Sequence, residues 1–160
     1  MQFLKLFEPI TINKMTLSNR IVMPAMHMGF ADRGYMTDQL VEFYAERARG
    51  GAGLIMLGGC SVDRRGKGLD SMVSIESDEF LEGFTRFATD VHAARSDVKI
   101  GAQLYHAGRY SFSVFTGEQT VSSSPIYSKF SKEMPRALSL SISSNMKISG
   151  LSSRYLSIAE

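Results

Sequence analysis

The residues best suited to chemistry lie close together between positions 103 and 109. This stretch holds an amide, a phenol, an imidazole and a guanidinium, and Gly108 allows the chain to turn there. Residues 99–102 precede it as a short apolar run, which is typical of a buried strand. Because α/β folds place their chemistry just beyond the carboxyl ends of parallel strands, we expect a functional site here. The alternative is a polar loop that merely leaves a strand.

The composition of the chain limits the class of protein, the partners and the metal sites that we can expect. The chain has 160 residues, of which 44% are hydrophobic and 21% charged, so it can bury a core as one domain or as part of a larger one. A net charge of +2 favours neither nucleic acid nor a membrane surface as a partner. One cysteine excludes an internal disulfide and an all-cysteine metal site. No run is long enough for a signal peptide or a membrane span, so we expect a cytoplasmic protein. We assign no metal-binding residues.

The first half of the chain predicts a hairpin, a strand and a helix. Residues 10–12 and 15–17 are short β-like runs joined by Asn13, which tolerates the conformation of a tight turn. Residues 20–24 form an apolar strand that stops at Pro24, with a loop over 25–29. Thr37 is the expected cap of a helix that ends at Gly50-Gly51. Its predicted buried face consists of Leu40, Val41, Tyr44, Ala45 and Ala48.

The second half repeats the alternation of strand and helix. Residues 54–57 predict a buried strand ending at residues 58–60, followed by a loop over about 61–76. Ser77 is the expected cap of the second helix. The buried face of this helix would consist of Phe80, Phe84, Phe87 and Val91. A third strand then leads to residue 103, and the order predicts an α/β fold with a parallel sheet and right-handed crossovers.

Four motifs in one order carry a family resemblance. They are Leu-Phe-Glu-Pro-Ile at 6–10, Asn-Arg-Ile-Val-Met-Pro-Ala-Met at 19–26, Arg-Ala-Arg-Gly-Gly-Ala-Gly-Leu-Ile at 47–55 and Gln-Leu-Tyr-His-Ala-Gly-Arg at 103–109. Together they resemble the amino-terminal part of an Old Yellow Enzyme-type NADH:flavin oxidoreductase. Within that family the chain is similar to the branch of 2,4-dienoyl-CoA reductases and 2-enoate reductases. The resemblance covers about residues 3–138.

The resemblance implies a fold, a reaction and cofactors. The family fold is a (β/α)8 TIM barrel with FMN at the carboxyl ends of its strands, and the hairpin closes the opposite end. NAD(P)H reduces FMN, and the flavin passes hydride to an activated alkene, here an enoate or a dienoyl-CoA-like small molecule. The implied cofactor-binding residues are Pro24, Ala25, Met26, His27, Gly59 and Gln103. Gly59 lies where a side chain would collide with the ring system, and the Gln103 amide can donate to and accept from the flavin's pyrimidine edge.

Other residues keep two interpretations at this point. His27 and Arg109 are candidate substrate contacts, but His27 can equally be a packed imidazole, and Arg109 can pair with a local carboxylate. His106 is interpreted as a structural residue of the turn rather than a proton donor. Cys60 is interpreted as a buried inert thiol rather than a redox group, and His92 as structural. The sequence identifies no catalytic residue.

The chain also departs from the family pattern. A TIM barrel usually needs about 250 residues, and only three of its eight strands are recognisable. Residues 139–160 contain eight serines. We therefore expect a partial FMN-binding barrel domain over 1–138 and a divergent serine-rich tail over 139–160, as in a truncated product. An open sheet edge would allow self-association, and the alternative function is a non-catalytic barrel fragment without the substrate and FMN-phosphate sites.

Overall fold

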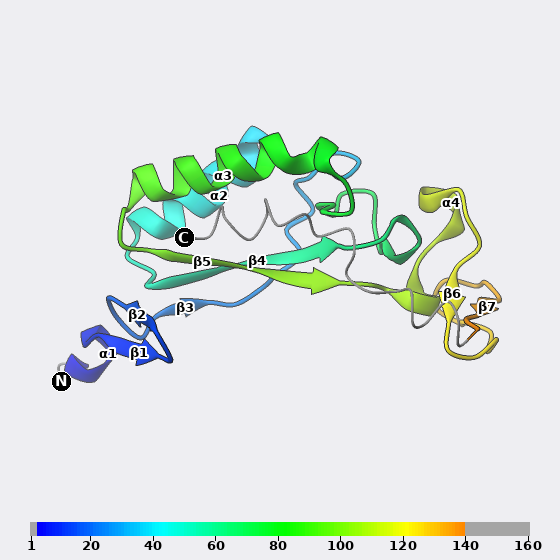
Figure 1. Cartoon of the computed structure of the whole chain (residues 1–160), viewed down its shortest axis with the longest axis horizontal. Helices are drawn as coiled ribbons and strands as arrows, with labels where there is room; N and C mark the ends of the chain where they lie inside the picture. Colours follow the sequence, from blue (N-terminus) through cyan, green and yellow to red (C-terminus); the bar gives the residue numbers. More distant parts are fainter. Residues whose placement is uncertain (1–2, 140–160) are drawn as a thin grey trace.

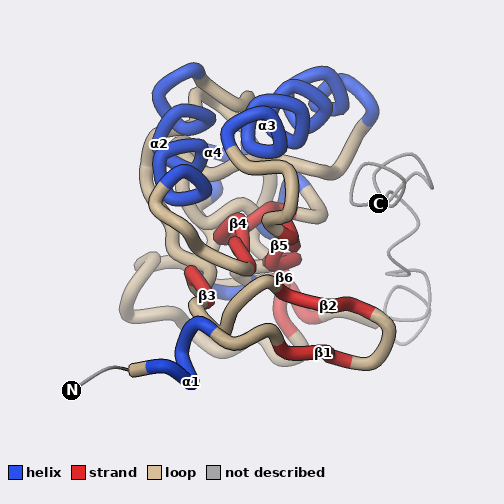
Figure 2. The backbone as a smooth tube through the Cα atoms, turned by 90° about the vertical axis from the view of Figure 1, so that its left-hand side faces the viewer, coloured by secondary structure: helices blue, strands red, loops and turns tan. Residues whose placement is uncertain are grey.

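A parallel three-stranded sheet with two helices on one face forms the centre of the molecule (Figure 1). The computed structural model describes residues 3–139. The strand order is β3-β4-β5, and both pairs are parallel, as predicted. Figure 2 shows α2 and α3 together on one side of the sheet. The bounds are β3 Val22–Met23, α2 Asp38–Arg49, β4 Leu54–Ser61, α3 Leu81–Ala94 and β5 Lys99–Tyr105.

The predicted hairpin is confirmed. After a short helix α1 (Leu4–Phe7), strands β1 (Ile10–Ile12) and β2 (Met15–Leu17) pair antiparallel. Asn13 has a φ of 53°, the left-handed conformation that Asn tolerates in a tight turn. In Figure 1 the hairpin lies at the end of the sheet where β4 begins, away from the arrowheads of β4 and β5. It therefore leaves the carboxyl ends of the strands open.

Helix α2 follows its sequence signals closely. The Thr37 side chain accepts a hydrogen bond from the Leu40 backbone N–H at 3.2 Å, which satisfies one of the free amides of the first turn. All five residues of the predicted face are buried. Tyr44 is fully buried, and the rings of Phe43 and Phe87 meet it edge-on with centroids at 5.4 Å. The core therefore forms where α2 and α3 meet above the sheet.

Helix α3 has the predicted buried face but not the predicted cap. Phe80, Phe84, Phe87 and Val91 are all buried. The chain enters α3 through a 3-10 turn, η2 (Asp78–Phe80), and the Ser77 hydroxyl donates to the Glu79 carboxylate at 2.7 Å rather than capping the backbone. The prediction for Ser77 was wrong because a nearby carboxylate competes for its hydroxyl.

Strand β4 is longer than its apolar run predicted. We expected it to end at residues 58–60, but it continues to Ser61 because β5 pairs with it again beyond the glycines. The pairs Cys60↔Leu104 and Ser61↔Tyr105 follow a register shift between Leu57 and Cys60. A single sequence does not reveal such a shift, because pairing to another strand decides it.

Short elements follow β5 and lie beyond its carboxyl end, coloured yellow to orange in Figure 1. They are η3 Gly108–Tyr110, α4 Ser113–Thr116 and the parallel pair β6 Val121–Ser122 and β7 Arg136–Ala137. The predicted tail lies, apart from Ser139, outside the described residues. Within residues 3–139 no helix is both long and apolar enough to cross a membrane. A cytoplasmic location stays a prediction.

Candidate functional site

The predicted site residues gather where the three parallel strands end. The loop of residues 24–29 leaves β3, the glycine pair lies near the end of β4, and Gln103 lies near the end of β5. Parallel strands bring their carboxyl ends to one edge of the sheet, so segments far apart in sequence meet there. The structure thus brings Met26, Gly58 and Gln103 to the same edge, although they belong to three different strand ends.

A β-bulge in β4 places two glycines opposite Gln103. Leu57 pairs with Ala102 and Cys60 pairs with Leu104, so Gly58 and Gly59 together lie opposite Gln103. Two residues opposite one define a bulge, and bulges re-aim the residues around them. Gly59 has a φ of +61°, which disfavours any residue with a Cβ. The bulge therefore places a stretch without side chains next to the amide.

Gly58 has no room for a side chain, which we did not predict from the sequence. A Cβ on Gly58 would lie 2.1 Å from the Met26 carbonyl oxygen and 2.3 Å from the Met26 nitrogen. Only glycine therefore lets the backbone of the β3 loop lie directly against β4. From the sequence we expected a close approach at Gly59 alone. The signal available was the double glycine after an apolar run, but the partner is 32 residues earlier in the chain and could not be recognised.

Gln103 lies within β5 rather than after it. It shares a face of the strand with Gly101, because alternate residues point the same way. Its side chain is exposed, and it forms no hydrogen bond to any residue of the described segment. Within residues 3–139 the Gln103 side chain therefore has no bond to a local loop. Its amide therefore retains its full capacity to donate and to accept.

His27 lies at the edge of a small cavity beside the β3 loop. The cavity is lined by Met26, Tyr44, Gly58 and Ser71, among others. The His27 Nε2 atom lies 3.4 Å from the Ser71 hydroxyl oxygen. Partial burial lowers the pKa of His27, since desolvation disfavours the imidazolium. At neutral pH the ring is therefore neutral, and it lies next to the backbone that the resemblance assigns to the flavin.

The Nδ1 contact and the packing of His106 support the structural role that we expected. Its Nδ1 accepts a hydrogen bond from the Gly108 N–H at 3.0 Å, which braces the turn after β5. Its ring packs on Gly66, where a Cβ would lie 2.4 Å from the imidazole Cδ2. Burial lowers the pKa of His106, so the neutral ring is favoured. A ring held by a local amide and covered by a glycine is poorly placed to give protons to a substrate.

Arg109 does not have the local carboxylate partner that was one of its two interpretations. Its guanidinium donates to the Tyr110 hydroxyl at 2.9 Å and lies 5.0 Å from the centroid of the Tyr110 ring. No ion pair joins it to a carboxylate within the part of the chain that the structure describes. The cation therefore remains available to an anionic group, and its role toward substrate stays a prediction.

Cys60 and His92 are structural. Cys60 is fully buried in β4, and burial raises the pKa of its thiol to about 12. A thiol with that pKa is protonated and unreactive at neutral pH. The His92 Nε2 atom lies 3.2 Å from the Val98 carbonyl oxygen, close to the end of α3. Neither residue takes part in the candidate site.

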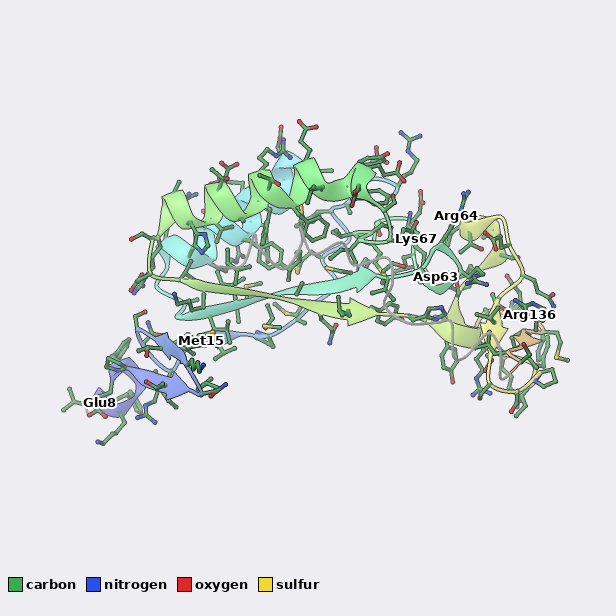
Figure 3. The ribbon with its side chains drawn as sticks, viewed as in Figure 1. Glu8, Met15, Asp63, Arg64, Lys67 and Arg136 are labelled. Atoms are coloured by element: carbon green, nitrogen blue, oxygen red, sulfur yellow. The ribbon has the colours of Figure 1, made fainter. Side chains whose placement is uncertain are left out.

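Two ion pairs hold charged side chains of the loop after β4. The Asp63 carboxylate accepts two bonds from the Arg65 guanidinium, at 2.7 and 3.0 Å, and this pairing lowers the pKa of Asp63. Lys67 is buried and donates to Asp70 at 3.2 Å. Figure 3 places Asp63, Arg64 and Lys67 beyond the end of β4. These contacts hold the loop beside the site, so its basic residues do not form a free basic patch. Within residues 3–139 no three His, Cys, Asp or Glu side chains could hold a metal ion together.

Comparison with known proteins gives matches along most of the chain. The model of the NADH:flavin oxidoreductase / NADH oxidase family matches residues 5–152. A metal reductase from Desulforamulus reducens is 49% identical over 130 residues, which are 81% of this chain and 19% of the relative. An NADH oxidase from Thermoanaerobacter brockii is 36% identical over 141 residues, which are 86% of this chain and 21% of the relative. The chain thus spans about a fifth of the length of these relatives.

Comparison with a solved structure supports the predicted fold. The old yellow enzyme homologue from Zymomonas mobilis superposes with a TM-score of 0.84 at 29% identity. The superposition covers 97% of this chain and 46% of that one. The predicted fold class, part of a (β/α)8 barrel that begins with a hairpin, is confirmed.

Proposed function

Because the chain belongs to the NADH:flavin oxidoreductase / NADH oxidase family, we propose that it forms one wall of the FMN site of an NAD(P)H-dependent oxidoreductase. One observation carries the proposal. The bulge of Gly58 and Gly59 lies opposite Gln103, whose amide has no hydrogen-bond partner within residues 3–139, and the Met26 backbone lies against Gly58. A flat, polar-edged ring system needs closely packed backbone beside it and a bordering group that both donates and accepts.

Each strand end has its own role in this proposal. The backbone of Pro24, Ala25, Met26 and His27 runs along the flavin, because the loop after β3 lies against Gly58 at Met26. Gly59 lets the flavin ring approach β4. Its positive φ disfavours any residue with a Cβ at this position. Gln103 meets the pyrimidine edge with its amide. The neutral amide matters, since a carboxylate there would oppose negative charge on a reduced flavin.

The substrate class is a proposal on the same site. When bound, FMN supplies hydride transfer from NAD(P)H to an acceptor, for which we propose an activated alkene of the enoate or dienoyl-CoA-like class. Arg109 would hold an anionic group of that substrate, because its guanidinium has no carboxylate partner within residues 3–139. His27 would contact the substrate as a neutral ring. The acceptor assay should also include ferric ion and dioxygen, since relatives are named a metal reductase and an NADH oxidase.

Titration with FMN tests the proposal directly. The full chain should quench FMN fluorescence and give a bound-flavin absorption spectrum. Gln103→Glu should weaken FMN binding about tenfold, the loss expected when one good hydrogen bond becomes repulsive. Gln39→Glu is the matched control, because Gln39 is exposed on α2 and the same charge is added away from the site. Equal FMN affinity of the two variants would contradict the role of Gln103, and a colourless folded protein would contradict direct binding.

A second candidate is a non-catalytic barrel fragment. The carboxyl-terminal half of β5 supports this candidate, because Ala102, Gln103 and Leu104 are exposed there and β5 is an edge strand within residues 3–139. Exposed edges present unpaired backbone groups that can pair with another chain. Such a fragment would self-associate and bind no FMN, so sedimentation at several concentrations beside the FMN titration separates the two candidates. The division into a barrel part at 1–138 and a tail at 139–160 belongs to this candidate and stays a proposal.

A further inference from the structure

A buried hydroxyl lies directly under the contact between β4 and the β3 loop. The Gly58 N–H donates to the Tyr44 hydroxyl oxygen at 3.3 Å. Gly58 lies in the bulge, where the ladder between β4 and β5 is interrupted. A Cβ on Gly58 would meet the Met26 carbonyl oxygen at 2.1 Å. Tyr44, Gly58 and Met26 therefore form a stack of contacts that joins helix α2 to the β3 loop.

The hydroxyl of Tyr44 is not needed for packing. The ring is held edge-on by Phe43 and Phe87, which a phenylalanine at position 44 would satisfy equally well. Burial raises the pKa of Tyr44, so the hydroxyl stays protonated and neutral at physiological pH. A polar group at a fully buried position is unfavourable unless it has a partner. The partner here is Gly58, so the hydroxyl serves the bulge.

We propose that Tyr44 is a positioning residue for the flavin wall: its hydroxyl holds the Gly58 amide, and Gly58 in turn sets how closely the Met26 backbone lies against β4. This inference rests on the proposed function, because it assumes that the Met26 loop and the bulge contact the flavin. Tyr44 itself lies beneath the wall, on the helix side of the sheet, and acts through Gly58. The same small cavity is lined by Tyr44, Met26 and His27, so a shift of the stack would reach both loop residues.

The test compares two Tyr→Phe variants in the full chain. Tyr44→Phe removes the hydroxyl under the bulge. Tyr35→Phe is the matched control, because it also removes one hydrogen bond, from the Tyr35 hydroxyl to Glu79 at 2.9 Å, but on an exposed loop. Three quantities are measured: FMN affinity with the absorption spectrum of the bound flavin, exchange of the Gly58 amide, and the backbone resonances of Met26 and His27.

We expect Tyr44→Phe to weaken FMN binding about tenfold, to speed exchange of the Gly58 amide about tenfold or more, and to shift the resonances of Met26 and His27. Tyr35→Phe should change none of these. An unchanged spectrum, affinity and Gly58 exchange in Tyr44→Phe would overturn the proposal. A purely structural hydroxyl would lower the melting temperature without moving the flavin spectrum or the Met26 resonance, which would also overturn it.

These measurements distinguish failure of the proposed function from failure of the proposal for Tyr44. If the wild-type chain binds no FMN, the proposed function fails for this chain, while the Gly58 exchange and the Met26 and His27 resonances still decide the role of Tyr44. If Tyr44→Phe does not fold, wild-type chain labelled with 3-fluorotyrosine is used, whose oxygen is a weaker acceptor. Faster Gly58 exchange in the labelled chain supports the proposal, and unchanged exchange overturns it.

Discussion

Strands β4 and β5 pair along most of their length, yet their environments differ. Every residue of β4 from Leu57 to Ser61 is buried. In β5 the residues from Ala102 to Leu104 are exposed. The two strands share one ladder, so the difference comes from their neighbours. Strand β4 lies between β3 and β5, whereas β5 is the last strand of the sheet within residues 3–139.

This difference separates the two parts of the candidate site. Strand β4 contributes shape, through the bulge of Gly58 and Gly59, which neighbours hold on both sides. Strand β5 contributes a functional group, the Gln103 amide, on a side that stays accessible. A rigid central strand and an accessible edge are complementary, because binding groups need a fixed geometry but also an open approach. Three experiments test this difference between the strands.

Thiol reactivity should show the largest difference between the strands. Ala102→Cys places an exposed thiol on β5, while Cys60 is the buried thiol of β4. Burial raises the pKa of Cys60 to about 12, so its reactive thiolate is scarce at pH 8 and increases only as the pH approaches 12. An exposed cysteine ionises near pH 8.5, so we expect it to react on the order of 10³-fold faster.

Alkylation with iodoacetamide, followed by mass spectrometry of the two peptides, measures both thiols in one molecule. Denaturation in urea is the control, because both thiols should then react at similar rates. Similar rates in the folded chain would mean that β4 is not the buried strand described here.

Core truncation should give the next largest difference. Ile55 in β4 and Ile100 in β5 are direct partners in the ladder, but Ile55 is 0% exposed and Ile100 is only partly buried. Ile55→Ala should lower the free energy of unfolding by about 3 kcal/mol and Ile100→Ala by about 1 kcal/mol. Urea unfolding followed by circular dichroism measures both. Equal losses would show that the outer strand is packed as tightly as the central one.

Adding a methyl group should give the smallest difference. Gly58→Ala places a Cβ against the Met26 backbone and should lower the free energy of unfolding by about 2 kcal/mol. Gly101→Ala in β5 meets the end of the Met56 side chain, at 2.6 Å from its sulfur, and a flexible side chain can move away. We expect a loss below about 1 kcal/mol there. A tolerated alanine at position 58 would show that the β3 loop is not pressed onto β4.

The sequence predicted the local elements well. The hairpin turn at Asn13, the cap at Thr37 and the buried faces of both long helices were confirmed, because each depends on residues a few positions apart. The cap at Ser77 was wrong because a nearby side chain competed for the hydroxyl. The end of β4 was wrong because pairing with β5 continued past two glycines that are turn signals when considered alone.

The candidate site was predictable only in its parts. Motifs identified Gln103, the β3 loop and one glycine, since each type of side chain has its own chemistry. Neither the contact of Gly58 with Met26 nor its bond to Tyr44 was predictable, because each joins segments that meet only in the folded sheet. The same limit applied to Arg109. Its two interpretations differed in whether a carboxylate lies next to the guanidinium, and the folded structure was needed to decide this.

The sequence was enough to predict the alternation of strands and amphipathic helices, the buried faces and the family to which the chain belongs, because these depend on residue type and short-range spacing. The folded structure was needed to show where β4 bulges, which glycine lies against Met26, and which hydroxyl supports that glycine. The physical reason is that these features depend on the register between strands and on close backbone contact, and both are set by segments distant in sequence.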